Sequence, residues 1–311
     1  MACSKQPRYM KRHIPTIIIM AFALAALVMI VTTIAPKPAA DKQPVFPAYQ
    51  TLAPQTNQTK KISQTKQAAQ ANANRPPLIT TAPISGSSAK LYSKREYKTL
   101  SGRILTYYWL EPPRHEAQAE RKHLPLTLLL HDATGRNYAA DYIAGQTMRR
   151  AMPSYVIVPV TPSPPIWAHP ESQYAAYENL GYTEELIGAI MQDYPIDQNR
   201  IYVMGCSGGG AGALGALARY PDLFAAGVSI SGFWDPIDAP IMTDTPLLVI
   251  HGTKDTKIPV AQTRNLVKAI KEHGGHKIVY REVQTMDHQC HSPELYSRPV
   301  WQWLFSQRKA G

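Results

Sequence analysis

The chain has 311 residues, of which 44% are hydrophobic and 18% charged, and it carries a formal net charge of +11. Residues 1–90 contain 11 Lys and Arg against one acid, Asp41, whereas the remainder is nearly balanced, with 22 basic and 21 acidic residues. A balanced globular part without a basic run argues against a nucleic-acid partner, and the length suits one large α/β domain behind a non-globular leader.

The N-terminal segment predicts a membrane anchor. Residues 1–13 form a basic tail without an acid, and residues 14–35 then run for 22 residues without a charge. Such a run is long enough to span a bilayer, and its basic flank predicts that the N-terminus stays in the cytoplasm. Pro36 directly after Ala35 disfavours cleavage, so we expect an uncleaved signal anchor rather than a cleaved signal peptide.

Residues 36–90 are predicted to be a disordered linker. Pro, Thr, Gln, Ala, Asn, Ser and Lys dominate this segment, which has almost no aromatic or long aliphatic side chains to bury. A flexible coil of this length would hold the next domain about 40 Å from the membrane. We therefore expect a single-pass protein of the inner membrane, with its folded domain at 91–311 in the periplasm or another extracytoplasmic space.

From residue 91 onward, apolar runs of strand length alternate with helical patterns. The runs lie at 104–110, 126–131, 155–160, 201–204, 226–230, 247–251 and 277–283. Several are continuous, which indicates strands buried on both faces, and helical segments such as 182–193 and 260–273 provide crossovers between them. The pattern predicts an α/β fold with a mostly parallel sheet flanked by helices, in which ligands bind beyond the carboxyl ends of the strands.

A sharp turn at 205–209 predicts a nucleophile. Its residues read Gly-Cys-Ser-Gly-Gly and lie between the strand pattern at 200–204 and a helix pattern of small residues at 210–219. This strand, G-x-S-x-G turn and helix form a nucleophile elbow, which exposes the hydroxyl of Ser207 and aims the next backbone N–H at developing negative charge. The alternative is a chance match in a glycine-rich loop, which the flanking strand and helix disfavour.

A serine nucleophile needs an acid that orients its base. Asp255 lies in a short loop directly after the apolar run at 247–251, at the carboxyl end of a predicted strand, and is our candidate. Three other acids in the preceding loop are the alternatives, as ordinary turn residues beside Pro or Gly. These are Asp235, Asp238 and Asp244.

The base is expected after the last strand. His288 follows the run at 277–283 and precedes a closing helix predicted at 293–306. His291 is the rival, but it lies close to the helix entrance, where a histidine more often serves as a surface or capping group. We therefore predict the chain order Ser207, Asp255, His288.

The segments YPIDQNRIYVMGCSGGG, ARYPDLFAAGVSISG and HGTKDTKIP, in this order, resemble esterases of the α/β-hydrolase fold. Within that fold the chain is most similar to polyhydroxybutyrate-depolymerase-like esterases, feruloyl esterases and prolyl-oligopeptidase-like hydrolases, over about residues 100–306. The resemblance implies that fold and an oxyanion hole formed by the N–H groups of Gly208 and Ala133. Asp132, just before Ala133, stands where the family customarily has glycine.

The resemblance also bears on the cysteines. Tannases and fungal feruloyl esterases bond two cysteines that lie beside the serine and the histidine, and here Cys206 precedes Ser207 while Cys290 follows His288 by two residues. In an oxidising compartment this implies a disulfide, with two unbonded buried thiols as the alternative.

Two rival chemistries use the same cysteines. Cys206 as the nucleophile, as in dienelactone hydrolases, is disfavoured because Met204 would then occupy the position where the elbow requires glycine. A zinc site is disfavoured because adjacent residues cannot easily point to one centre and no second ligand cluster appears. Its ligands would be Asp287, His288, Cys290 and His291.

Together these patterns predict a membrane-anchored serine hydrolase that cleaves a small-molecule or polymer-derived carboxylic ester through an acyl-enzyme, without metal or organic cofactor. Trp167 and Trp234 follow strand ends and are expected either to line the substrate pocket or to cover the edge of the core. The alternatives are a serine peptidase of the prolyl-oligopeptidase type and a non-catalytic binding module of the cell envelope. The pattern predicts no oligomeric state.

Overall fold

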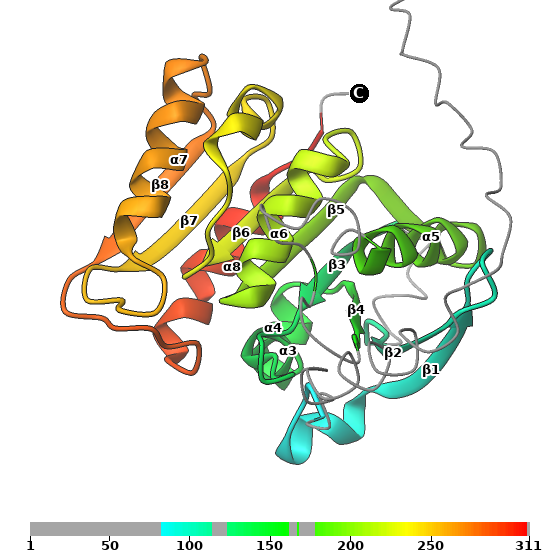
Figure 1. Ribbon diagram of the computed structural model, residues 1–311. Helices are drawn as coiled ribbons and strands as arrows, with labels where there is room; N and C mark the ends of the chain where they lie inside the picture. Colours follow the sequence, from blue (N-terminus) through cyan, green and yellow to red (C-terminus); the bar gives the residue numbers. More distant parts are fainter. Residues whose placement is uncertain (1–81, 114–122, 162–166, 168–177, 310–311) are drawn as a thin grey trace, which may run out of the picture. The chain divides into compact units, whose positions relative to one another are not determined.

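The computed structural model describes residues 82–113, 123–161, 167 and 178–309 (Figure 1). The predicted cytoplasmic tail, the predicted anchor at 14–35 and most of the predicted linker lie outside these residues. Within the described ranges, no helix is both long enough and apolar enough to cross a membrane.

The folded part begins before residue 91. Ile84 is only 3% exposed, Pro83 accepts a hydrogen bond from the backbone N–H of Asn137 at 2.8 Å, and the 3-10 helix η1 covers Gly86–Leu91. The last residues of the range that we assigned to the linker therefore pack on the domain.

The described residues form an eight-stranded sheet. Its strands are β1 (Ser93–Lys98), β2 (Ile104–Leu110), β3 (Leu124–Leu130), β4 (Tyr155–Pro159), β5 (Ile196–Cys206), β6 (Ala226–Ile230), β7 (Leu247–Gly252) and β8 (Ile278–Val283). The order across the sheet is β1-β2-β4-β3-β5-β6-β7-β8; β2 is antiparallel to both neighbours, and every later pairing is parallel. The carboxyl ends of the parallel strands therefore share one edge.

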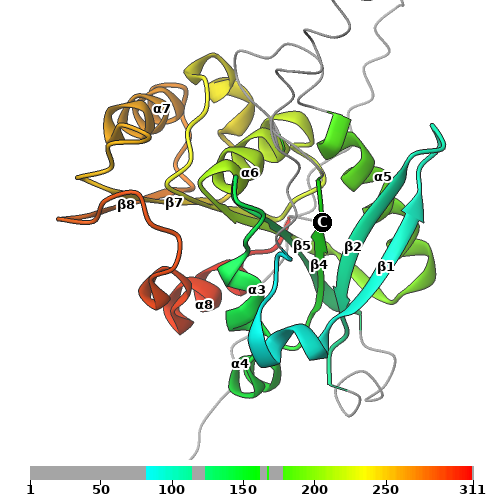
Figure 2. The same ribbon diagram turned by 60° about the horizontal axis from the view of Figure 1, so that its bottom comes forward.

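Helices cover both faces of the sheet (Figures 1 and 2). One face carries α5 (Glu178–Asp193), α6 (Gly208–Arg219) and α7 (Val260–Glu272); the other carries α3 (Tyr138–Ile143), α4 (Gln146–Ala151) and α8 (Arg298–Ser306). Side chains alternate across a strand, so Leu128 of β3 lies in the first core and Leu129 in the second. Short 3-10 helices, η3 (Pro236–Met242) and η4 (Pro293–Tyr296), complete the described elements.

The strands predicted from the apolar runs at 104–110 and 226–230 coincide with β2 and β6. Strand β1 was not predicted, because its residues SKREYK are polar and mostly exposed at the sheet edge. The predicted closing helix is interrupted at Ser297, which has extended backbone (φ −62°, ψ 157°), and α8 starts anew with Pro299 in its first turn. Proline suits that position because its missing N–H has no helical acceptor there.

Candidate active site

Ser207 occupies the turn between β5 and α6. Its backbone has φ 56° and ψ −120°, a conformation that is costly for a residue with a side chain and that marks functional turns. A Cβ on Gly205 would collide with the backbone of Gly209, and a Cβ on Gly209 would collide with the carbonyl group of Leu130. The flanking glycines are therefore what allows the turn to be this tight.

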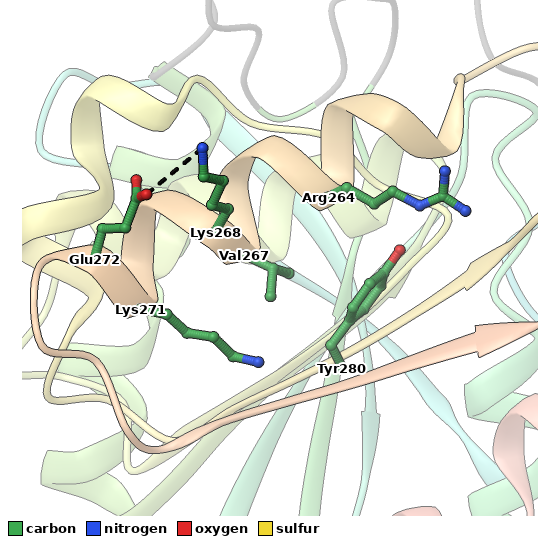
Figure 3. Close-up of a pocket in the computed structure, with 6 residues that line it drawn as sticks. All are labelled: Arg264, Val267, Lys268, Lys271, Glu272 and Tyr280. Atoms are coloured by element: carbon green, nitrogen blue, oxygen red, sulfur yellow. Dashed lines mark ion pairs between the residues drawn. The ribbon is translucent and has the colours of Figure 1, made fainter.

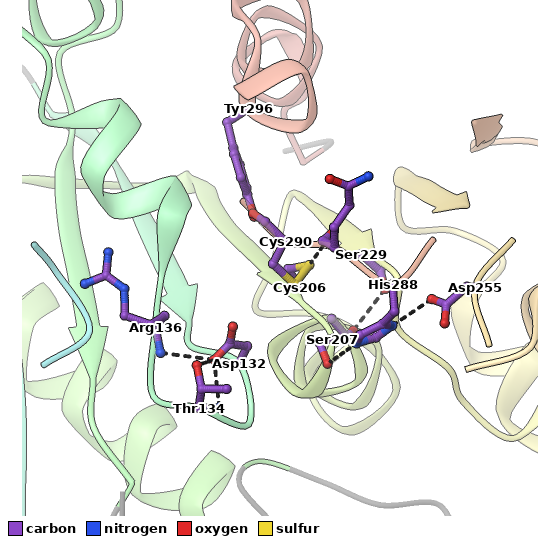
Figure 4. Close-up of a disulfide and its surroundings, with 12 residues drawn as sticks. Asp132, Thr134, Arg136, Cys206, Ser207, Ser229, Asp255, His288, Cys290 and Tyr296 are labelled. Carbon is purple, nitrogen blue, oxygen red and sulfur yellow. Dashed lines mark hydrogen bonds and ion pairs between the residues drawn. A yellow bond between two sulfur atoms is a disulfide. The ribbon is translucent and has the colours of Figure 1, made fainter. Parts of the chain in front are cut away.

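Three side chains from separate loops meet at the carboxyl edge of the sheet (Figure 4). The Ser207 Oγ lies 2.8 Å from Nε2 of His288, and Nδ1 of His288 lies 2.7 Å from Oδ2 of Asp255. His288 follows β8 and Asp255 follows β7. The side chain of Asp255 is fully buried and that of His288 is 11% exposed, so the histidine has a face open toward solvent while the carboxylate does not.

The buried carboxylate of Asp255 is held by several donors. Its Oδ1 accepts backbone N–H groups of Lys257 at 3.0 Å and Ile258 at 2.8 Å. Its Oδ2, besides facing His288, lies 3.2 Å from Nε2 of His251. These contacts on both oxygens fix the orientation of the buried carboxylate.

The structure gives the rival acids and the rival base other partners. Asp235 accepts the N–H of Ile237 at the start of η3, Asp238 accepts Nε1 of Trp234, and the Asp244 carbonyl accepts Nζ of Lys277. The ring of His291 is exposed and packs edge-on 6.4 Å from Tyr138. None of these contacts brings a rival residue to Ser207.

The loop after β3 is closed by the side chain of Asp132. Its Oδ1 accepts the N–H of Thr134 at 2.8 Å, the Thr134 hydroxyl at 2.6 Å and the N–H of Arg136 at 3.1 Å. Leu130 pairs with Gly205, so this loop and the elbow lie side by side at the sheet edge. Within the described part of the chain, the backbone N–H groups of Ala133 and Gly208 donate to no acceptor. Asp132, at the position where glycine was expected, thus stabilises the loop through the hydrogen bonds that its side chain accepts.

His131 anchors the root of the same loop. Its buried Nδ1 lies 2.8 Å from the carbonyl oxygen of Asp132, and Nε2 accepts the N–H of Thr161 at 3.1 Å. Burial lowers the pKa of His131, so the ring is neutral, with its proton on Nδ1. A neutral ring in this tautomer satisfies both contacts.

An ion pair joins this loop to the start of the folded part. Nη2 of Arg136 donates to Oδ2 of Asp141 at 2.8 Å and to Oγ of Ser85 at 2.7 Å. Oδ1 of Asp141 also accepts the N–H of Ser85 at 2.9 Å. The point where the N-terminal segment enters the domain is therefore tied to the loop that carries Ala133.

Cys206 and Cys290 form a disulfide across a sequence separation of 84 residues. The Cys290 carbonyl also accepts the hydroxyl of buried Tyr296 at 2.8 Å. The bond removes Cys290 from the alternative zinc set and Cys206 from the alternative thiol mechanism. Among the described residues, no group of three His, Cys, Asp or Glu side chains is arranged to hold a metal ion.

The two tryptophans, expected either to line the substrate pocket or to cover the edge of the core, are both buried in this structure. Trp167 is 0% exposed and Trp234 is 2% exposed. Nε1 of Trp167 donates to the carbonyl of His131 at 2.8 Å, and a Cβ on Gly212 of α6 would collide with the Trp167 side chain. Their indole rings fill space under the helices, which is the other reading that the sequence left open.

A cavity of about 450 Å³ lies away from this site, between α7 and β8 (Figure 3). Among its charged lining residues, Lys268 lies 3.5 Å from Glu272, and Arg264 lies 2.7 Å from Glu282. Tyr280 forms its floor. None of these residues contacts the Ser207 cluster, so the chemistry of the chain is not located in this cavity.

One family model matches this chain, and solved structures share its fold. The family model described as "Putative esterase" matches residues 112–297. The fold is similar to a thermostable esterase, with 26% identity and a TM-score of 0.64, covering 71% of this chain and 64% of that one. This chain thus spans less than two thirds of that esterase. A search of curated proteins found no match.

More distant solved structures show the fold alone. One is a CE1 ferulic acid esterase from Anaeromyces mucronatus, with 14% identity and a TM-score of 0.52, covering 70% of this chain and 90% of that one. Another is an acylaminoacyl peptidase from Pyrococcus horikoshii, with 16% identity and a TM-score of 0.52, covering 69% and 41%. Both support an α/β-hydrolase-like arrangement of sheet and helices.

Proposed function

This chain belongs to the esterase family, and from that premise we propose that it hydrolyses carboxylic esters through a serine nucleophile and an acyl-enzyme. The observation that carries the proposal is the continuous contact from Ser207 Oγ to His288 Nε2, at 2.8 Å, and from His288 Nδ1 to Asp255, at 2.7 Å. A base within this reach can take the hydroxyl proton, and a carboxylate on its far nitrogen sets its tautomer.

The proposed reaction has two halves. In the first, Oγ of Ser207 bonds to the ester carbonyl carbon while its proton passes to Nε2 of His288; His288 then gives that proton to the departing alcohol. In the second, His288 takes a proton from water as the water oxygen attacks the acyl carbon, and His288 then returns that proton to Oγ of Ser207 as the bond between Oγ and the acyl carbon breaks and the acid leaves. Asp255 orients His288 and stabilises its protonated form throughout.

The negative charge on the tetrahedral oxygen requires donors. We assign this role to the N–H groups of Gly208 and Ala133, which have no other acceptor among the described residues. Gly208 opens α6, so its N–H is one of the helix-terminal donors and adds the positive end of the helix dipole. These steps need neither a metal nor an organic cofactor.

Location is part of the proposal. Residues 14–35 would anchor the chain in the inner membrane, with the tail 1–13 in the cytoplasm and the hydrolase outside it. The disulfide between Cys206 and Cys290 supports an oxidising compartment, where such bonds persist. Carbonate-resistant sedimentation of the full chain with membranes, lost when residues 1–35 are removed, is the expected result; sedimentation that survives the deletion would contradict it.

Turnover of short p-nitrophenyl esters by the purified full chain tests the activity. We expect acetyl and butyryl esters to be cleaved, and Ser207→Ala and His288→Ala to lose about 10⁴-fold or more of kcat. His291→Ala is the matched control and should retain activity. Absence of turnover by the wild type on these esters and on feruloyl and hydroxybutyrate esters would favour a binding module, and preferential cleavage of peptide anilides would favour a peptidase.

A further inference from the structure

A second histidine, His251, contacts the acid of the candidate triad. His251 lies near the carboxyl end of β7, and its side chain is 0% exposed, as is that of Asp255. Its Nε2 lies 3.2 Å from Oδ2 of Asp255 and 2.9 Å from the carbonyl oxygen of Ile258. The same carboxylate oxygen therefore receives both imidazoles.

The contacts of the ring fix where its proton resides. The Ile258 carbonyl and the Asp255 carboxylate can only accept, so Nε2 must carry a hydrogen. On the other side, Nδ1 lies 2.7 Å from Oγ of Thr263, which is 1% exposed. Burial lowers the pKa of His251, so the ring is neutral and Nδ1 can only accept. The Thr263 hydroxyl has two possible acceptors, Nδ1 at 2.7 Å and the carbonyl oxygen of Gly232 at 3.1 Å.

Resting on the proposed function, we propose that His251 is a positioning residue for Asp255, held in its donor tautomer by Thr263. By donating to the Ile258 carbonyl it closes the loop 252–258, and by its 3.2 Å contact with Oδ2 it restrains the rotation of the carboxylate that faces His288.

The other charged groups around His251 do not provide this effect. The groups that interact with it electrostatically are Asp255, His288 and, from β8, Glu282. Glu282 is already paired with Arg264 at 2.7 Å. Glu282→Gln therefore serves as a control that changes a nearby charge without touching the contact.

The test compares two substitutions of similar size. His251→Gln can place an amide N–H close to the position of Nε2, whereas His251→Leu fills the space without a donor. For the full chain acting on p-nitrophenyl butyrate, we expect His251→Leu to lower kcat about 10- to 100-fold with little change in KM, as for a misplaced catalytic group. His251→Gln should restore most of the lost kcat, because its amide N–H can take the place of the Nε2–H group.

Several outcomes would overturn the inference. One is a folded His251→Leu variant with wild-type kcat. Another is a Gln variant whose kcat is as low as that of the Leu variant, which indicates a role in packing only. If His251→Leu does not fold, Thr263→Val should lower kcat with little change in KM and Thr263→Ser should not, and a Val variant with wild-type kcat would refute the assignment. Loss of activity in Ser207→Ala with wild-type behaviour of His251→Leu rejects this inference alone, whereas activity that survives Ser207→Ala rejects the proposed function.

Discussion

Cys206 and Cys290 are bonded across 84 residues of sequence, one residue before Ser207 and two residues after His288. The disulfide thus connects the elbow of β5 to the loop that carries the proposed base. Because the bond closes a long loop next to both groups, it links stability to catalytic geometry.

Removing the disulfide should reduce stability and activity together. For Cys206→Ser with Cys290→Ser we expect a loss of about 2–5 kcal/mol in the free energy of unfolding, and a lower kcat because the His288 loop is released. Urea denaturation and ester turnover, with and without dithiothreitol, measure both. Cys3→Ser is the control, and a wild-type protein whose stability and kcat are indifferent to reductant would contradict the prediction.

Asp132→Ala should impair catalysis more than binding. The substitution removes the acceptor of three hydrogen bonds that Thr134 and Arg136 donate within the loop. The backbone N–H of Ala133 is then no longer held in position to donate to the oxyanion. A misaimed oxyanion donor costs about 10²-fold in kcat. Asp132→Asn keeps an acceptor oxygen and should recover most of kcat. Ala and Asn variants with the kcat of the wild type would show that the hydrogen bonds of Asp132 do not contribute to catalysis.

The ion pair of Arg136 with Asp141 should contribute to stability but little to turnover. Both side chains keep some contact with solvent, 17% and 23% exposed. Ion pairs that solvent reaches contribute about 0–1 kcal/mol to the free energy of unfolding. We expect Asp141→Asn to lower the free energy of unfolding by about 1 kcal/mol, with kcat within about twofold of the wild type. A tenfold fall in kcat would mean that the N-terminal attachment sets the geometry of the Ala133 loop.

Stability should decline as the pH falls below the ordinary range of histidine. Burial lowers the pKa of His131 and of His251 from the ordinary value of 6.5, so below that value the unfolded chain binds protons that the folded chain does not. Stability is therefore full above about pH 6.5 and falls as pH drops, while most carboxylates, with pKa values near 4, stay ionised. Melting temperatures at pH 7.5 and 5.5 measure this, and a melting temperature that is flat or higher at pH 5.5 would refute it.

The sequence predicted the parts of the fold that depend on local pattern. Continuous apolar runs located β2 and β6 because strands buried on both faces need no polar alternation, and the glycines at 205 and 209 located the elbow because a Cβ has no room there. The edge strand β1 could not be predicted in this way, because its exposed residues are polar and form no apolar run.

The missed features of the site arise from contacts between distant loops. Nothing in the spacing of His251 shows that its ring shares an oxygen with His288; its only signal is a polar residue at the end of the apolar run LLVI. From the sequence, Asp132 at the expected glycine position put the geometry of the oxyanion loop in doubt. Its three hydrogen bonds within the loop depend on where the backbone places Thr134 and Arg136, which the sequence does not show. Trp167 and Trp234 follow strand ends, which is compatible with either a pocket wall or the edge of the core, and their burial places them in the core.

The central claim is that Ser207 is the nucleophile. Treating the full chain with a fluorophosphonate and mapping the adduct by peptide mass spectrometry tests it most directly. We expect one phosphonyl group on Ser207. This adduct should form much more slowly in His288→Ala and be absent in Ser207→Ala. Labelling of another residue, or labelling that persists in Ser207→Ala, would contradict it.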